Sequence, residues 1–282
     1  MIFIADGGST KADWIALDNS KNELFRTRTL GLNPAVFPEE TLYNRVINNF
    51  QLVQNKDLVK EIYFYGAGCG TPKPTQLLVT VFKSIFINAK VVVKEDLYGA
   101  VYASSGGRKS IVCILGTGSN SCYFDGEKLM TNVVSLGYIL MDEASGNYFG
   151  KKLIRDYFYH KMPDIIAEKF ENTYNLDPDE IKRNLYQEES PNAYLGKFAQ
   201  FMFEFKEHAY IRQIIEEAFN TFFEYRIKPY KQATDVPIYF IGSIAYFFES
   251  ILQEVADKFG YTIKEIIRRP IDNLIAYHQN NL

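Results

Sequence analysis

The sequence has few of the residues that build disulfides and metal centres. Its cysteines are Cys69, Cys113 and Cys122, an odd number without a close pair. This favours a reduced, cytoplasmic protein over a disulfide framework. The three histidines lie far apart and lack the spacing of metal ligands. The Gly-x-x-x-x-Gly-Lys-Ser/Thr pattern of Walker nucleotide-binding loops does not occur.

Long apolar runs and clusters of basic residues are also missing. No apolar stretch approaches the length that spans a bilayer, and Asp6 comes too early for a signal peptide, so no membrane partner is expected. The formal net charge is −3, and Lys and Arg form no cluster, which argues against nucleic acid as a partner. Aromatic residues are abundant instead, with 22 Phe and 20 Tyr in 282 residues, enough to fill the cores of two domains.

The first hairpin is the feature around which we expect the chain to be organised. Residues 1–5 predict a short buried strand and residues 12–18 a return strand. The loop between them is Asp6, Gly7, Gly8, Ser9, Thr10 and Lys11. Bare backbone N–H groups, two hydroxyls and a cation suit a polyphosphate, and the carboxylate suits Mg²⁺ held through water. The alternative is a surface turn that happens to be rich in Gly and Ser.

The rest of the N-terminal half predicts a sheet covered by helices. Strands are expected at residues 23–30, 61–65 and 90–93, and helices at 38–52 and 74–86. Asn33 is a turn residue before Pro34, although its amide could also reach a ligand hydroxyl. Asp96 follows the last of these strands and begins a helix. It is either an N-cap or a carboxylate at the carboxyl edge of the sheet, where ligands of open α/β sheets bind.

After a small-residue break at 104–107, the opening pattern repeats. Strands are predicted at 110–115, 121–124 and 127–133, with the polar glycine turn Gly116–Asn120 between the first two. Two such hairpins could clamp one phosphate chain. We therefore expect two domains, residues 1–105 and 106–282.

The remaining sequence completes the second domain. Asp142 and Glu143 precede a helix that runs to about residue 160, where they could favour the helix dipole or accept sugar hydroxyls. A helical, aromatic insertion is predicted at about 160–231. A strand at 236–241 leads into Gly242 and Ser243, which open a helix from 244 to 258; a strand at 261–267 and a terminal helix at 271–277 follow.

Together these motifs resemble the N-acetylglucosamine kinase branch of the sugar kinase, actin and heat-shock ATPase superfamily. Asp6–Lys11 and Gly116–Asn120 look like its two phosphate motifs. Ile238–Ser243 looks like its adenosine motif, with Ser243 where members often carry a second glycine. The resemblance implies an α/β protein of two ribonuclease-H-like domains with mixed five-stranded sheets that close on ATP and sugar. The terminal helix could pack back on the first domain.

The resemblance also implies an activity and its residues. It predicts an ATP- and Mg²⁺-dependent kinase for an amino sugar, N-acetylglucosamine at its 6-hydroxyl being the first choice. Another sugar, such as glucosamine or an N-acetylmuramic-type sugar, and an activator ATPase of the dehydratase or reductase type are the alternatives. The absence of a cysteine-rich loop argues against the activator class. An actin-like filament protein is a third alternative, and a homodimer is an open possibility.

The predicted site residues fall into five groups: the catalytic base, the metal ligand, and the residues that contact the phosphates, the adenosine and the sugar. Asp96 is the base on the sugar hydroxyl, and Asp6 holds Mg²⁺ through water. The ATP phosphates contact Gly7, Gly8, Ser9, Thr10, Lys11, Gly116 and Thr117, and the adenosine contacts Gly242 and Ser243. The sugar contacts Asn33, Asp96, Gly118, Ser119, Asp142 and Ser145.

Overall fold

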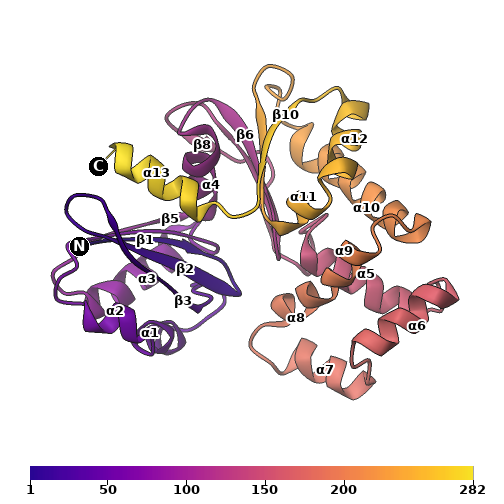
Figure 1. Ribbon diagram of the computed structural model, residues 1–282, viewed down its shortest axis with the longest axis horizontal. Helices are drawn as coiled ribbons and strands as arrows, with labels where there is room; N and C mark the ends of the chain where they lie inside the picture. The colour runs from indigo at the N-terminus through magenta and orange to yellow at the C-terminus, as the bar shows by residue number, and fades with distance from the viewer. Residues whose placement is uncertain (282) are drawn as a thin grey trace. The chain divides into compact units, whose positions relative to one another are not determined.

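The computed structural model describes residues 1–281, which divide into two compact units (Figure 1). The first unit contains Met1–Gly106 together with the segment that begins at Pro270, and the second contains Gly107–Arg269. Each unit is built on one five-stranded sheet with helices on it. None of the helices among residues 1–281 has both the length and the apolar character needed to cross a bilayer.

The sheet of the first unit is mixed and has the order β3-β2-β1-β4-β5. Its strands are β1 (Ile2–Gly7), β2 (Lys11–Leu17), β3 (Glu23–Leu30), β4 (Glu61–Gly66) and β5 (Lys90–Glu95). The first three form an antiparallel meander, whereas β4 and β5 run parallel to β1. The carboxyl ends of β1, β4 and β5 therefore meet at one edge, which places Asp6, Gly66 and Glu95 in successive strands of that edge.

Helices cover both faces of this sheet because side chains alternate along the buried strands. The helices are α1 (Glu39–Ile47), α2 (Phe50–Gln54), α3 (Pro72–Ile85), α4 (Asp96–Ser105) and α13 (Ile271–Asn281). Phe3 and Ala5 of β1 pack in the cluster that includes α1, α2 and α3, whereas Ile4 packs with Ala103 of α4 and Leu274 of α13. The C-terminal helix thus belongs to the core of the first unit.

The second sheet repeats the order of the first. Its order is β8-β7-β6-β9-β10, with β6 (Ser110–Leu115), β7 (Ser119–Phe124), β8 (Leu129–Met130), β9 (Ile238–Ile241) and β10 (Ile263–Ile267). Again the first three strands are antiparallel and the last two run parallel to the first. The predicted α/β class with two mixed five-stranded sheets is confirmed.

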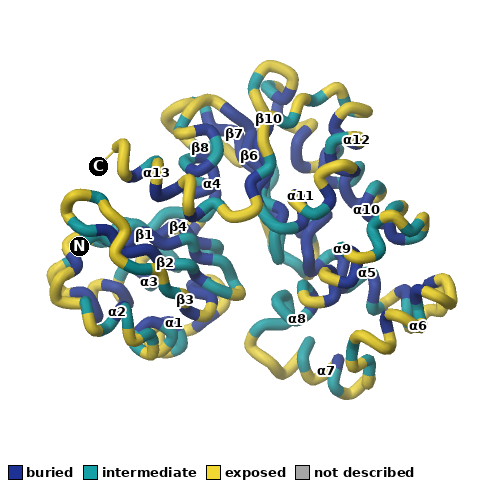
Figure 2. The backbone as a smooth tube through the Cα atoms, viewed as in Figure 1, coloured by how far each residue is buried: buried dark blue, intermediate teal, exposed yellow. Residues whose placement is uncertain are grey.

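A helical lobe is inserted between β8 and β9 of the second unit. Helix α5 (Gly146–Phe158) leads into α6 (Asp164–Thr173), α7 (Pro178–Tyr186), α8 (Pro191–Phe198), α9 (Gln200–Glu204), α10 (Ala209–Phe222) and the π-helix η1 (Phe223–Ile227). Helices α11 (Ser243–Phe247) and α12 (Glu249–Phe259) lie between β9 and β10 in the chain. One large cluster of buried residues includes Phe149, Phe170, Phe219 and Phe240, so the abundant aromatic residues fill the core. In Figure 2 the backbone of β6 and β7 has the dark blue of buried residues.

Three predicted elements are shorter or divided in the structure. The helix predicted at 38–52 ends and restarts, because the side chain of Asn49 caps α2 by accepting the N–H of Leu52 at 3.1 Å. The helix predicted at 244–258 is divided at Phe248 into α11 and α12. The strand predicted at 127–133 is only Leu129–Met130, because Asp125 accepts the N–H groups of Glu127 and Lys128 and extends the turn.

Candidate active site

The first glycine loop is a closed turn with its backbone held from two sides. Gly8 donates its N–H to the carbonyl of Lys11 at 2.8 Å, and Gly31 donates to the carbonyl of Thr10 at 3.0 Å. A Cβ on Gly31 would lie 2.0 Å from the carbonyl oxygen of Ser9. Residue 31, which directly follows β3, must therefore be a glycine for the backbone to pass so close to the loop. Thr10 is exposed and Ser9 is half-buried.

Asp6 at the end of β1 lies directly opposite Asp13 of β2. Burial, together with the negative charge of Asp13, raises the pKa of Asp6 to about 6. Burial alone would raise the pKa of Asp13 as well, but hydrogen bonds from Arg28 and Lys11 lower it. The ammonium of Lys11 lies 3.1 Å from Asp13, so this cation is paired within the hairpin.

These carboxylates fit a magnesium ion that keeps its water. In the part of the chain that the structure describes, no group of three or more His, Cys, Asp or Glu side chains could hold a metal ion directly. Mg²⁺ on a nucleotide takes most of its ligands from phosphate and water and needs only one or two carboxylates. A cation beside Asp6 would also offset the repulsion from Asp13 that raises the pKa of Asp6.

Asn33 ties the phosphate loop to the loop that follows β3. Its side-chain amide donates to the hydroxyl of Ser9 at 2.8 Å, and its carbonyl oxygen accepts the N–H of Ala35 at 2.9 Å. The turn after β4 packs against it closely, because a Cβ on Gly68 would lie 1.9 Å from the Asn33 oxygen. These two hydrogen bonds leave one amide proton and one oxygen lone pair of the Asn33 side chain for a ligand. Asn33 is 7% exposed.

Asp96 is the first residue of α4 and not its N-cap. The cap position is Glu95, whose side chain makes no capping hydrogen bond. The carboxylate of Asp96 accepts the N–H of the next residue, Leu97, at 2.9 Å. Both acidic residues raise the pKa of the buried Cys69 thiol, although burial is the larger cause, so all three groups lie near one another. The carboxylates of Glu95 and Asp96, at the junction of β5 and α4, therefore lie close to the turn after β4 that carries Cys69.

Sequence analysis did not single out Glu95. Its carboxylate lies against the same turn, since a Cβ on Gly70 would be 3.1 Å from its Oε1. Among residues 1–281 it has no hydrogen-bond or ion-pair partner, and burial raises its pKa above the ordinary value. A half-buried carboxylate without a partner beside Asp96 is typical of a residue kept for binding rather than stability.

Replacing Glu95 with Gln is expected to stabilise the protein at neutral pH. The raised pKa means that the folded chain binds this proton more tightly than the unfolded chain, so the ionised carboxylate lowers stability above the folded pKa. Below the ordinary value of 4.5 both states are protonated and the penalty vanishes. Thermal unfolding of wild type and E95Q at neutral pH and below pH 4.5 checks this. A lower Tm for E95Q at neutral pH would contradict it.

The second glycine turn joins β6 to β7 and is braced by the start of α5. Gly116 donates to the carbonyl of Gly118 at 3.0 Å. The first N–H groups of α5, from Gly146 and Asn147, donate to the carbonyls of Gly116 and Thr117 at 2.8 and 3.0 Å. The N–H groups at the start of α5 have no partner within the helix, and these two hold the turn in place instead.

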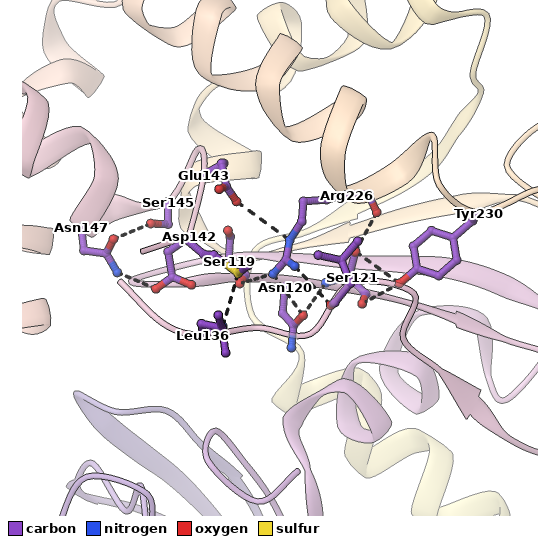
Figure 3. A network of polar contacts seen from close by, with 12 residues as sticks. Ser119, Asn120, Ser121, Leu136, Asp142, Glu143, Ser145, Asn147, Arg226 and Tyr230 are labelled. Atoms are coloured by element: carbon purple, nitrogen blue, oxygen red, sulfur yellow. Dashed lines mark hydrogen bonds and ion pairs between the residues drawn. The ribbon is translucent and has the colours of Figure 1, made fainter. Parts of the chain in front are cut away.

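Asp142 lies against this turn in a buried polar network (Figure 3). A Cβ on Gly118 would lie 2.8 Å from Asp142 Oδ2, and the same oxygen accepts the Asn147 amide at 2.9 Å. Ser145 caps α5 and donates its hydroxyl to Asn147 Oδ1 at 2.9 Å. Burial raises the pKa of Asp142, although Asn147 and the N–H of Ser119 favour its ionised form.

Two features of this network point to a ligand. Asp142 and Ala144 have positive φ angles of 68° and 57°, a conformation that costs free energy in residues other than glycine and occurs at functional sites. The hydroxyl of Ser119 is buried without a hydrogen-bond partner in residues 1–281. Buried polar atoms without a partner are rare, and a ligand would satisfy this one.

Gly242 brings the predicted adenosine motif to the second glycine turn. It is the N-cap of α11 with a φ of 121°, and Ser243 is the first helical residue. A Cβ on Gly242 would lie 2.2 Å from the carbonyl oxygen of Leu115 and 3.1 Å from the N of Gly116. Glycine is thus required at residue 242 both by its conformation and by the backbone that it contacts.

The structure adds four residues that sequence analysis did not assign: Glu95, Asn147, Arg226 and Tyr230. Asn147 carried a weak signal in the sequence, since an amide side chain follows the Asp142–Ser145 stretch by two positions. In the structure this side chain is buried. Arg226 and Tyr230 carried none, because they are more than 100 residues away in the chain from strand β7, which they contact. Their contacts are visible only in the folded chain (Figure 3).

Comparison with known proteins identifies the family. No protein-family model matches the chain, and no curated protein matches it. Among solved structures, a candidate N-acetylglucosamine kinase from Porphyromonas gingivalis has 34% sequence identity and a TM-score of 0.91, covering 100% of this chain and 99% of that one. One from Chromobacterium violaceum has 12% identity and a TM-score of 0.77, with 98% of each chain covered.

A more distant neighbour shares the fold. It is a ROK family glucokinase from Streptomyces griseus in complex with glucose and AMPPNP, with 12% identity, a TM-score of 0.57 and 98% and 97% of the two chains covered. The fold predicted from the sequence, that of the two-domain actin-like kinases, is confirmed. With more than 30% identity over its whole length to the Porphyromonas gingivalis protein, the chain belongs to the N-acetylglucosamine kinase-like family of the sugar kinase and actin superfamily.

Proposed function

We propose that the protein is an ATP-dependent sugar kinase and that its substrate is an amino sugar, N-acetylglucosamine, phosphorylated at the 6-hydroxyl. The observation that carries the proposal is the repeated glycine–hydroxyl turn, which joins the first two strands of each of two sheets of identical order. Family membership supports the kinase activity. The names of the two N-acetylglucosamine kinase-like neighbours support the substrate.

Each turn is suited to hold phosphate oxygens with backbone N–H groups. Gly7 and Gly8 with the hydroxyls of Ser9 and Thr10 would do so in the first unit, and Gly116 and Thr117 in the second. Mg²⁺ would be held through water by Asp6, and it would neutralise charge on the phosphates. Phosphoryl transfer depends mainly on positioning and charge stabilisation, so such a set of fixed donors suffices for the nucleotide side.

The sugar side would use the two carboxylates that follow the sheets. Asp96 would orient the 6-hydroxyl and accept its proton, and Asp142 would accept a second sugar hydroxyl. Ser119 would use the hydroxyl that has no partner in the described chain. Asn33 would contribute its remaining amide proton, and Gly118 the close backbone approach.

The activator-ATPase alternative fits the structure poorly. As the resemblance implies, such proteins bridge two subunits with an iron–sulfur cluster held by closely placed cysteines, whereas Cys69, Cys113 and Cys122 are all buried. Burial raises the pKa of Cys69 to about 12 and that of Cys113 well above its ordinary value. Neither thiol is therefore primed to become the thiolate that ligates a metal.

ADP release measured with and without sugar tests the proposal. In the presence of Mg²⁺ and ATP, N-acetylglucosamine is expected to raise ADP release sharply, and mass spectrometry is expected to show a sugar monophosphate. A panel with glucosamine, N-acetylmannosamine and glucose ranks the substrates in one experiment. Equal ADP release with and without every sugar, together with an iron–sulfur chromophore in the purified protein, would support the activator class.

A further inference from the structure

Arg226 of η1 is a buried cation whose side chain contacts the start of β7 (Figure 3). Its side chain is 1% exposed. The guanidinium donates to the carbonyls of Val133 at 3.3 Å and Ser119 at 3.5 Å, and to the side-chain oxygen of Asn120 at 3.5 Å. It therefore contacts both residues that directly follow Gly118.

The same guanidinium faces the loop that carries Asp142. Its Nε lies 4.0 Å from the carboxylate of Glu143, and both Arg226 Nε and Glu143 Oε2 are buried without a hydrogen-bond partner in the described chain. A buried ion pair with loose geometry contributes little to stability, because removing both ions from water costs as much as their attraction returns. The Arg226–Glu143 pair is better explained by the segments that it holds in place, which are the start of β7 and the loop that carries Asp142.

A local irregularity of the helix directs Arg226 to this position. After α10 the chain forms the π-helix η1, closed by the bond from the N–H of Lys228 to the carbonyl of Phe223 at 2.9 Å. The hydroxyl of Ser121 donates to the carbonyl of Arg226 at 2.8 Å, and Tyr230 donates to the carbonyl of Ser121 at 3.0 Å. Single-turn π-helices occur frequently at functional sites, where they turn a side chain out of the helical register.

We propose that Arg226 is a positioning residue for the sugar: through Ser119, Asn120 and Glu143 it fixes the Gly118 end of the turn relative to Asp142. This inference rests on the proposed kinase function. The other end of the turn is fixed independently, since Gly146 and Asn147 hold the carbonyls of Gly116 and Thr117. Loss of Arg226 should therefore disturb the sugar contacts and leave the phosphate contacts in place.

Steady-state kinetics of Arg226→Met separates the two ends of the turn. The KM for N-acetylglucosamine is expected to rise roughly 10-fold or more, because small displacements of binding groups have large effects, while the KM for ATP changes less than about twofold. Arg226→Lys keeps the cation and should recover part of the loss. Arg212→Met is the matched control, because Arg212 lies in the adjoining α10 and pairs with Glu216 and Glu254.

A second pair of variants covers the case in which Arg226→Met does not fold. Glu143→Gln removes the partner charge, and Arg226→Met with Glu143→Gln removes both buried charges together. The sugar KM should rise in each. Where Arg226→Met does fold, the rise in the double variant should be less than the product of the two single effects, because the two residues act as one unit. Equal changes in both KM values, or a fall in kcat that only follows the loss of folded protein by CD, would overturn the proposal. Absence of sugar-dependent ADP release in wild type would instead refute the kinase function.

Discussion

Replacing Asp96 with Asn is expected to lower turnover of the sugar by roughly 10²-fold or more, the usual contribution of a general base. The amide keeps the size of the side chain and an oxygen that can accept the N–H of Leu97, as the carboxylate does at 2.9 Å. It cannot accept the proton of the sugar hydroxyl. ATP affinity measured by calorimetry should change little, because Asp96 is assigned no contact with the nucleotide.

Loss of a helix cap does not explain the expected fall in turnover of D96N. Asp96 is the first residue of α4 and its N-cap is Glu95, so the substitution removes no side-chain cap from the helix. What it does remove is a charge near the helix N-terminus, worth about 0.3–1 kcal/mol. Asp164→Asn is a matched control, because Asp164 is the exposed first residue of α6. Its substitution removes the same charge from the same helix position, at a place in the chain far from the glycine turns.

Each outcome of this comparison is decisive for Asp96. A thermal shift of similar size in D96N and D164N, with turnover lost only in D96N, is expected for a base. Turnover of D96N at the wild-type rate would exclude Asp96 from catalysis. Asp142 would then be the next carboxylate to test, since burial raises its pKa and it lies against Gly118.

Local patterns were sufficient to predict the sheets and both glycine turns. Strands could be predicted because the length and alternation of an apolar run are visible in neighbouring residues. The two glycine turns could be predicted because each is one continuous segment, Asp6–Lys11 and Gly116–Asn120. The structure places these turns between β1 and β2 and between β6 and β7. The same patterns predicted correctly that α4 begins at Asp96, but they left open whether Asp96 is its N-cap, because propensity does not distinguish Glu95 from Asp96 at that position.

The support of the second turn could not be predicted because it depends on contacts between distant residues. Arg226 meets Ser119 across 107 positions of sequence, and its direction depends on a π-helix that no sequence pattern specifies. Asp142 pairs with Asn147 in a backbone of positive φ, which Asp adopts more readily than most residues but which no local pattern specified at this position. The assigned roles of Asp96, Asn33 and the other site residues stay predictions until the variants are measured.

Replacing Gly118 with Val is expected to abolish turnover. A Cβ at this position would lie 2.8 Å from Asp142 Oδ2, closer than real Cβ atoms approach, and 3.3 Å from its Cγ, which is a tight contact. Asp142 cannot move freely, because Asn147 and the N–H of Ser119 hold its carboxylate. The branched side chain would therefore displace the proposed sugar acceptor as well as fill the space beside the turn. Crowding of this kind costs about 1–3 kcal/mol, so the far-ultraviolet CD should stay close to wild type with a lower Tm.

Gly116→Ala separates this steric effect from a general intolerance of the turn. No atom lies within 4 Å of a Cβ built on Gly116, so Ala adds a methyl group at the phosphate end of the turn without a collision in the protein. Its Tm should equal that of wild type, and any kinetic effect should fall on the KM for ATP. Gly118→Ala should instead raise the KM for the sugar, since even one methyl group meets Asp142. If Gly118→Val kept near-normal turnover, residues 116–120 would be a structural turn only, and the sugar would have to bind without the Gly118–Asp142 contact.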